Sequence, residues 1–299
     1  MKNSSQLFAF ARKTATATLF AVCLLTVASC TKLRSGQSFV AESDGINYRY
    51  EVIVSNHNYV RVTPVSGPEA VTGAINIPST VRHEDYTYVV TQIGANAFSN
   101  YTGITSITIP GTVSIIETNA FRNCQSLTTV NVSNSISTID AYAFENCSQL
   151  QSFHFATSLS TLGQGCFRGC SSLTTADLPS TITVVPDEAF NGCTSLSSLQ
   201  LPATIMQIGN KAFAHCTGLR SIYLDRSVQQ IGDSTFFDCD SVQSITCLTP
   251  TPPACSVTTF GNMPTSIPVT VMMSSINNYQ VATGWNRITN YIGTYLSII

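Results

Sequence analysis

His154 and its neighbours are the residues of this sequence whose types and spacing could support catalysis. Asn131 precedes His154 and Asp177 follows it at the same interval, one repeat of the chain on either side. Coils that repeat with this period would stack the three side chains about one strand spacing, ~4.8 Å, apart. A histidine beside a carboxylate is the local arrangement of an oriented general base, and Ser152 or Thr175 would supply a hydroxyl nucleophile.

Two features of the same positions argue against catalysis. A nucleophile needs shelter and a pocket that stabilises an oxyanion, whereas the sheet face of a repeat stack is open and shallow. A hydroxyl residue also recurs at this position in every repeat, as a structural ladder would: Ser106, Thr129, Ser152, Thr175, Ser198, Ser221 and Ser244. We therefore predict no catalytic residue and a protein that is not an enzyme.

The other three histidines have structural interpretations. His57 lies in a predicted turn, Ser55 to Asn58, and His83 lies in the insertion Arg82 to Asp85, both solvated loops. His215 belongs to a column of residues that tolerate left-handed backbone, which is typical of a turn. That column reads Asn123, Asn146, Gly169, Gly192, His215 and Asp238.

A set of cysteines recurs with the same period, at Cys124, Cys147, Cys170, Cys193, Cys216 and Cys239. A zinc site needs four ligands that converge on a point, whereas this spacing stacks the thiols in a row. Parallel stacked copies keep their Cβ atoms ~4.8 Å apart, beyond the usual ~3.5 to 4.5 Å of a disulfide. We predict buried free thiols, no metal and no cofactor, and leave open whether Cys166, Cys247 or Cys255 form disulfides.

A strict 23-residue repeat supplies the elements that position these residues. Its clearest marker is an evenly spaced series of phenylalanines, at Phe98, Phe121, Phe144, Phe167, Phe190, Phe213 and Phe236. A period of this length with leucine-like positions is typical of a leucine-rich-repeat solenoid. Apolar pairs spaced by two, from Ile107/Ile109 through Ala176/Leu178 to Ile245/Cys247, predict one short strand per repeat. A glycine column, Gly94, Gly163, Gly209 and Gly232, predicts a tight turn.

One outward column varies while everything around it repeats. It is polar with one aromatic residue and reads Thr108, Asn131, His154, Asp177, Gln200, Tyr223 and Thr246. Folding does not require such variety, so we assign a protein or glycan contact to this recognition column, with charges such as Glu145 on the opposite face. The alternative, that these are solvated strand positions only, stays open.

The N-terminus carries a targeting signal. A basic start precedes an apolar run from Leu19 to Val27, which is too short to span a bilayer as a helix. Val27 to Cys30 resembles the lipobox of bacterial lipoproteins, so residues 1–29 are predicted as a lipoprotein signal peptide and Cys30 as the lipidated residue that attaches the chain to a membrane. Residues 30–37 would form a tether.

Composition excludes nucleic acid as a partner. Only 10% of the residues are charged, and the formal net charge is −2. Removal of the signal peptide takes away Lys2, Arg12 and Lys13 and leaves about −5. No basic stripe remains to follow a phosphate backbone.

The repeat from Ile104 to Cys124, Leu-x-x-Ile-x-Ile-Pro-x-x-Val-x-x-Ile-x-x-x-Ala-Phe-x-x-Cys in general form, resembles the BspA-type leucine-rich repeat, or leucine-rich repeat type 5. The resemblance implies a parallel β-sheet with turns and loops on its convex side. It divides the chain into a β-rich N-terminal cap (38–78), repeats (79–248) and a small α/β C-terminal cap (249–299). The predicted hairpin from Ile46 to Val65 belongs to the first cap, and the strand from Pro268 to Met272 and a helix with Tyr279 and Trp285 belong to the second.

The resemblance also implies binding instead of chemistry. Family members with assigned roles are mostly adhesins for host matrix proteins, host cells or neighbouring bacteria. We therefore expect an outer-membrane lipoprotein of a Gram-negative bacterium that binds a protein or glycan at the cell surface. The basic stretch Thr31 to Arg34 departs from the acidic residues that often follow the cysteine of surface-exported lipoproteins. A periplasm-facing structural or assembly protein is therefore the alternative.

Overall fold

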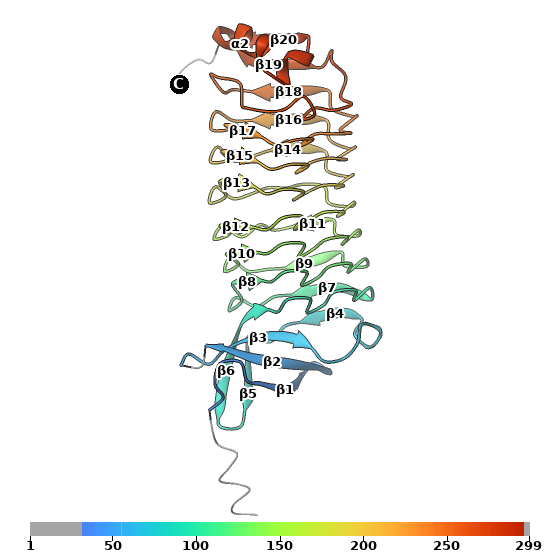
Figure 1. Ribbon diagram of the computed structural model, residues 1–299. Helices are drawn as coiled ribbons and strands as arrows, with labels where there is room; N and C mark the ends of the chain where they lie inside the picture. Colours follow the sequence, from blue (N-terminus) through green and yellow to red (C-terminus); the bar gives the residue numbers. More distant parts are fainter. Residues whose placement is uncertain (1–31, 55, 296–299) are drawn as a thin grey trace, which may run out of the picture.

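The computed structural model describes residues 32–54 and 56–295. The chain winds into a tall stack of coils, with extra strands at the N-terminal end and a short helix at the other end (Figure 1). The predicted solenoid of 23-residue coils is confirmed. Across the described residues, none of the helices is long and apolar enough to cross a bilayer.

The first sheet contains the strands that the apolar pairs predicted. Within the runs β7 to β11 and β14 to β18, residues pair in parallel with their counterparts in the next repeat, as Ile107 does with Val130 and Ser221 with Ser244. The inward residues are buried and those between them face outward. The strands are β7 (Ile104–Thr108), β9 (Thr129–Asn131), β11 (Ser152–Phe153), β14 (Ser198–Gln200), β16 (Ser221–Leu224) and β18 (Ser244–Cys247).

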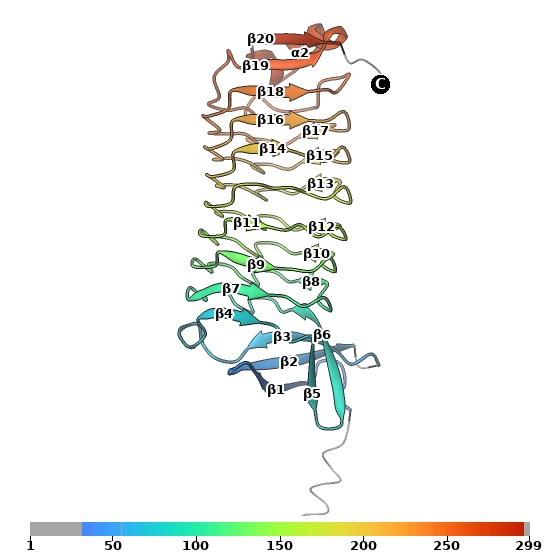
Figure 2. The ribbon, with the colours of Figure 1, turned by 180° about the vertical axis from the view of Figure 1, so that it is seen from behind.

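Each coil carries a second strand, so the prediction of one strand per repeat was incomplete. These strands are only two residues long, too short for a period-two pattern to reveal them. They stack in parallel on another side of the coil (Figure 2). They are β8 (Ile115–Ile116), β10 (Thr138–Ile139), β12 (Thr161–Leu162), β13 (Val184–Val185), β15 (Gln207–Ile208) and β17 (Gln230–Ile231).

The N-terminal strands continue this second sheet, except β4, which pairs with β7 in the first sheet. Its order is β1-β2-β3-β6-β8-β10-β12, and β6 joins the antiparallel strands to the coils. The predicted loop at Arg82 to Asp85 is instead the end of a β5–β6 hairpin, in which the ring of His83 stacks on Phe39 with centroids 4.3 Å apart. The bounds are β1 (Ser38–Ser43), β2 (Ile46–Val54), β3 (Tyr59–Pro64), η1 (Pro68–Ala70), β4 (Gly73–Asn76), β5 (Thr80–His83) and β6 (Tyr86–Ile93).

The C-terminal elements continue the first sheet through β18, β19 and β20. The strand predicted at Pro268 to Met272 is present, and Tyr279 lies on a helix as expected. Trp285 does not share that helix, because the chain breaks at Ala282 and resumes as a 3-10 turn. The bounds are β19 (Pro268–Met272), η2 (Met273–Ser275), α2 (Ile276–Val281), η3 (Trp285–Arg287) and β20 (Asn290–Thr294).

The phenylalanine ladder is the core of the stack. All seven rings are fully buried, and successive ring centroids lie 5.2 to 5.9 Å apart with nearly parallel planes. Phe260 adds an eighth ring, 5.8 Å above Phe236, and Trp285 covers it at 4.7 Å. Sequence periodicity missed Phe260 because the interval after Phe236 is longer than the repeat.

The glycine column begins a tight turn, as predicted, because the N–H groups of Ala97, Cys166 and Ala212 bond to the carbonyl oxygens of Gly94, Gly163 and Gly209. The need for glycine itself has a further cause. A Cβ atom on Gly163 would lie 2.2 Å from the backbone nitrogen of Ala141 in the preceding coil, and one on Gly209 would lie 2.4 Å from that of Asp187. Contacts this short are not tolerated, so these positions need glycine because neighbouring coils approach each other closely.

If the coil of β4 and β6 is counted as the first, β12 lies in coil four and β13 in coil five. Both sheets are interrupted where coil five follows coil four, at a break that we call the seam. Strands β12 and β13 are not paired, and neither are β11 and β14. In the second sheet, Gly209 donates its N–H to Val185 of the coil below, but Pro186 occupies the equivalent position and has no N–H to offer Leu162. The described residues also lack the bond from Val184 to Ser160, although its counterpart joins Thr161 to Ser137.

Side-chain size explains the interruption of the first sheet. Phe153 and Phe155 replace aliphatic residues, and the small Ala176 follows one coil later. The ring of Phe155 contacts the rings of both Phe167 and Phe190, centroids 5.3 and 6.3 Å away, and so leans across the coil of Ala176. The predicted strand at Ala176/Leu178 is therefore absent, and Leu178 bonds back to Ala176 in a tight turn around Asp177.

We expect Phe167→Ala to destabilise the protein by about 3 to 5 kcal/mol, because it removes a buried ring and leaves a cavity in the ladder. His154→Ala on the outward face should change the stability by less than about 0.5 kcal/mol. Chemical denaturation monitored by circular dichroism measures both. Equal losses would mean that the inward and outward columns are misassigned.

We expect the seam to open more readily than the coils beside it. The amide protons of Thr183 and Val184 should exchange with solvent about tenfold faster than those of Met206 and Gln207, which donate to the coil below. Hydrogen exchange measured by NMR tests this. Pro186→Ala supplies the missing N–H and should slow exchange at both residues, whereas Pro202→Ala should not. Equal exchange in the unmodified protein would contradict the idea.

Candidate functional site

The recognition column lies where the sequence placed it, on the outward side of the first sheet. Thr108 pairs with Asn131, Gln200 with Tyr223, and Tyr223 with Thr246. The column is longer than predicted, since Thr246 pairs with Thr270 and Thr270 with Ile292, a side chain 48% exposed. Tyr223 and Thr246 are half-buried and the other five predicted positions are exposed: Thr108, Asn131, His154, Asp177 and Gln200.

The hypothetical catalytic pair of His154 and Asp177 is not formed. In the part of the chain that the structure describes, the His154 side chain makes neither a hydrogen bond nor an ion pair. The seam separates the two residues, because coil five forms a tight turn around Asp177 instead of a strand. A carboxylate that does not contact the imidazole cannot orient it as a general base.

The turn column that contains His215 adopts the predicted left-handed backbone. The φ angles are 59° at Asn123, 58° at Asn146 and 58° at His215. The side chains also form ladders, in which Asn146 donates to Asn123 at 2.9 Å and His215 Nδ1 lies 3.1 Å from Asp238 Oδ2. His57 is an exposed turn residue, as predicted.

The cysteine ladder consists of buried free thiols, as predicted. Each Sγ donates to the carbonyl oxygen of the phenylalanine in the preceding coil, from Cys124 to Phe98 at 3.1 Å through Cys239 to Phe213 at 3.2 Å. Burial raises the pKa of the Cys124 thiol to about 12. A thiol with this pKa is hardly ionised at neutral pH, so the ladder is not a set of nucleophiles.

The three cysteines whose pairing the sequence left open are also free thiols. Cys247 is buried and accepts a bond from the Tyr279 hydroxyl at 3.2 Å. Cys255 is half-buried, and its Sγ donates to the carbonyl of Thr283 at 3.2 Å. Burial raises the pKa of Cys166 to about 12.

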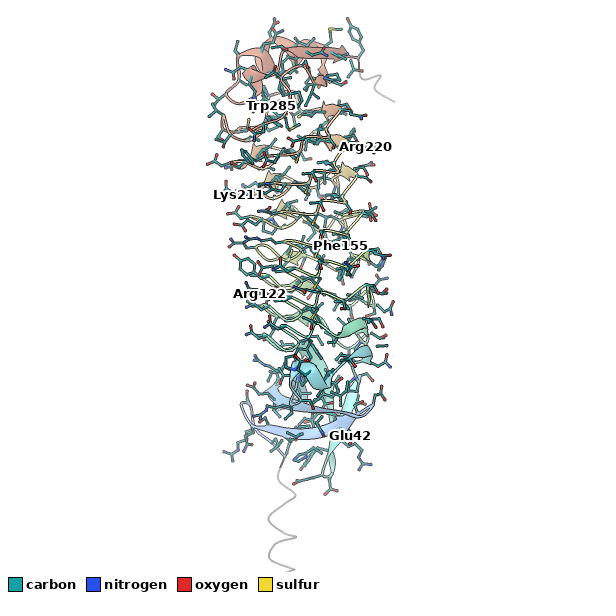
Figure 3. All side chains as sticks on the ribbon, turned by 90° about the vertical axis from the view of Figure 1, so that its right-hand side faces the viewer. Glu42, Arg122, Phe155, Lys211, Arg220 and Trp285 are labelled. Atoms are coloured by element: carbon teal, nitrogen blue, oxygen red, sulfur yellow. The ribbon has the colours of Figure 1, made fainter. Side chains whose placement is uncertain are left out.

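Glu145 is not the solvent-facing charge that the sequence suggested. Glu145 is only 6% exposed. Its carboxylate lies 2.6 Å from Nε of Arg122 and 3.8 Å from Nε of Arg168. Arg168 also contacts Glu188 at 2.7 Å. Arg122 lies along one long edge of the stack, and Arg220 along the other (Figure 3). The ion-pair network therefore links neighbouring coils on the turn side.

Sequence reasoning missed a hollow on the second sheet. Two adjoining depressions, with volumes of about 190 and 340 Å³, share Asn210, Gln230 and Gly232 in their walls. Together they form a shallow trough that runs from Val184 to Ser256 over β13, β15 and β17. The sequence feature that could have indicated this trough is a polar column at the repeat spacing, formed by Asp187, Asn210 and Asp233.

Residues 1–31, which contain the signal peptide and Cys30, lie outside the described residues. The lipidation site therefore stays a prediction from the sequence. So do the boundaries of the tether and the caps.

Comparison with known proteins agrees with the architecture. A family model for the BspA-type leucine-rich repeat region matches in six copies over residues 91–217 and 166–282, more than half of the chain. No curated protein sequence matches the chain significantly. The solved structure of a leucine-rich cell surface protein from Faecalibacterium prausnitzii A2-165 is 29% identical, with a TM-score of 0.62 over 73% of this chain. This chain spans 57% of the length of that relative.

Two further solved structures are similar. A leucine-rich repeat protein from Bacteroides ovatus ATCC 8483 is 20% identical, with a TM-score of 0.46 over 88% of this chain and 77% of its own. A leucine-rich repeat protein of T. pallidum is 21% identical, with a TM-score of 0.47 over 81% of this chain and 88% of its own. The 23-residue coils with their phenylalanine and cysteine columns, together with the family match, show that the chain belongs to the BspA-type leucine-rich repeat family.

Proposed function

We propose that the protein is a binding module of the cell envelope, attached to a membrane through lipid on Cys30, that contacts an extracellular protein or glycan through the recognition column. The observation that carries the proposal is the contrast between two adjacent columns of the first sheet. One repeats a hydroxyl in every coil, and the other changes from coil to coil. Varied side chains on a uniform rigid scaffold are how repeat proteins obtain specificity.

The geometry of the column suits a protein or glycan surface. It is open to solvent and continues across the C-terminal strands through Thr270 to Ile292. Tyr223 lies half-buried between Gln200 and Thr246, so its ring offers an anchored apolar contact among polar groups. Half-buried tyrosines of this kind contribute strongly to binding because they lose little conformational entropy.

An envelope location is supported by two observations. The lipobox-like sequence Val27 to Cys30 follows an apolar segment, and the relative from Faecalibacterium prausnitzii is described as a cell surface protein. We propose display on the outer membrane surface. The basic stretch Thr31 to Arg34 favours the alternative, a periplasm-facing envelope protein with a structural or assembly role. Protease treatment of whole cells distinguishes the two, because only a surface protein is digested.

The anchor can be tested with Cys30→Ser, which removes the atom that would carry the lipid. We expect this variant to lose labelling by radioactive palmitate and to leave the membrane fraction, because lipid attached at Cys30 is the proposed source of membrane affinity. Cys23→Ser is the matched control, since that residue lies within the predicted signal peptide and should change neither readout. Unchanged labelling of Cys30→Ser would refute lipidation at this residue.

The recognition column can be tested with the triple variant His154→Ala, Gln200→Ala and Tyr223→Ala. We expect binding to a ligand found in a panel of matrix proteins and glycans to weaken roughly tenfold or more. Circular dichroism and the thermal midpoint should change little, because all three side chains face outward.

The control is a pair of exposed polar residues away from the first sheet, Thr161→Ala on β12 with Gln164→Ala in the turn that follows it. We expect it to bind as the unmodified protein does. Glu145 is unsuitable as a control because its buried carboxylate contacts two arginines. If the triple variant binds at full affinity, the contact lies elsewhere on the molecule.

A further inference from the structure

The trough on the second sheet has the features of a second binding site. It lies over β13, β15 and β17, a different sheet from the one that carries the recognition column. Its two depressions adjoin and share three wall residues, so the hollow is elongated along the stack. A ligand seated there would cross at least three successive coils.

Unpaired amide groups line the trough. Gln207 and Gln230 are register partners in neighbouring strands, so their side chains lie about one strand spacing, ~4.8 Å, apart. Both are exposed, and among the described residues neither side-chain amide has a hydrogen-bond partner. Each amide offers two N–H donors and a carbonyl acceptor, a combination that can bond two adjacent hydroxyl groups of one ligand.

The next column holds a preformed polar ladder. Asp187 accepts bonds from the backbone N–H of Asn210 at 2.7 Å and from its side chain at 3.3 Å. Asn210 in turn accepts the backbone N–H of Asp233 at 2.8 Å. The Asp187 carboxylate and Asn210 amide are therefore fixed in orientation before a ligand arrives, which lowers the entropy cost of binding.

The charge of the trough selects among ligands. Its described lining contains Asp187 and Asp233 but neither lysine, arginine nor histidine. Phosphate, sulfate or uronic acid groups would therefore meet like charge without compensation. Val184, 42% exposed, and Pro186 add an apolar wall at one end, which matches the C–H faces of a pyranose ring. Nucleic acid and acidic polysaccharides are thus excluded in favour of neutral hydroxyl-rich molecules.

Backbone geometry favours a glycan over a peptide. A peptide binds a sheet by adding to the edge of a strand, whereas this trough lies on the face of strands that are already paired with one another. Gly209 and Gly232 lie between the glutamine column and the Asp187–Asn210–Asp233 column. No Cβ fits at either glycine, so the floor of the trough is low there. The amide spacing of ~4.8 Å is close to the advance of one sugar unit in an extended chain.

We propose that the trough between Val184 and Ser256 binds a neutral oligosaccharide in extended form, with Gln207 and Gln230 bonding the hydroxyl groups of successive sugar units. This site is separate from the recognition column. It would give the protein a glycan contact on one sheet independently of any ligand on the other.

An array of neutral and acidic oligosaccharides, including cellohexaose, mannohexaose and oligogalacturonate, tests the proposal with the full-length protein in detergent. We expect binding to one or more neutral chains and not to oligogalacturonate. Gln207→Ala with Gln230→Ala should weaken that binding about tenfold, the value for loss of one or two hydrogen bonds. Gln149→Ala with Gln151→Ala, two exposed glutamines outside the trough, should not.

The recognition-column triple variant separates this proposal from the proposed function. If neutral oligosaccharide binding survives in that variant and fails in the Gln207/Gln230 variant, the trough is the site. If the reverse holds, the glycan binds at the recognition column and the trough proposal is wrong. Binding of acidic chains alone, of no oligosaccharide, or at equal strength by the Gln207/Gln230 variant would also overturn it.

Discussion

Close stacking of successive coils on the turn side is the constraint on which the rest of the structure depends. There the N–H of each ladder phenylalanine bonds to the next coil, as Phe121 does to Ala143 at 2.7 Å, and each ladder thiol bonds to the phenylalanine carbonyl below. These contacts fix both the height and the rotation of each coil relative to its neighbours. The two sheets can therefore be short, and even interrupted, without loss of the stack.

The seam shows that the contacts on the turn side matter more for the stack than the sheets do. Pro186 removes one ladder bond, and the bulk of Phe153 and Phe155 beside Ala176 removes others, yet Phe167 still bonds to Ala189 at 2.9 Å and stacks on Phe190 at 5.6 Å. The Arg168–Glu188 ion pair crosses the same boundary. Continuity across the seam thus rests mainly on the turn side, with a few hydrogen bonds elsewhere, such as those from the Thr174 N–H to Gln151 and from the Thr181 hydroxyl to Leu159. The outward residues at the break, His154 and Asp177, lie where the first sheet is least regular.

Periodicity in the sequence was sufficient for the buried columns and for the longer strand of each repeat, but it missed the two-residue second strand. The phenylalanine, cysteine and strand columns each contain many copies of one environment, so one physical interpretation applied to all. The sequence pattern did not predict features that arise when an unusual residue in one coil changes its contacts with the adjacent coil. The effects of Pro186, of the Phe155–Ala176 pair and of Phe260 can be predicted only when the adjacent coil is known. The trough can be recognised only when two columns are considered together. The glycine column was correctly predicted to begin a turn, but the reason that glycine is needed there, the close approach of the neighbouring coil, is invisible in the sequence of one coil.

The identity of successive coil interfaces has an evolutionary consequence. Because each ladder thiol and phenylalanine meets the same partners one coil away, duplication or deletion of a whole repeat unit would recreate an interface that already exists. Gain or loss of a single residue must instead be absorbed within one coil, as the longer interval between Phe236 and Phe260 is, or it shifts the later columns out of line. The length of the molecule can therefore change by recombination in discrete steps, and each step adds or removes one position from the outward surface while leaving the interior chemistry unchanged.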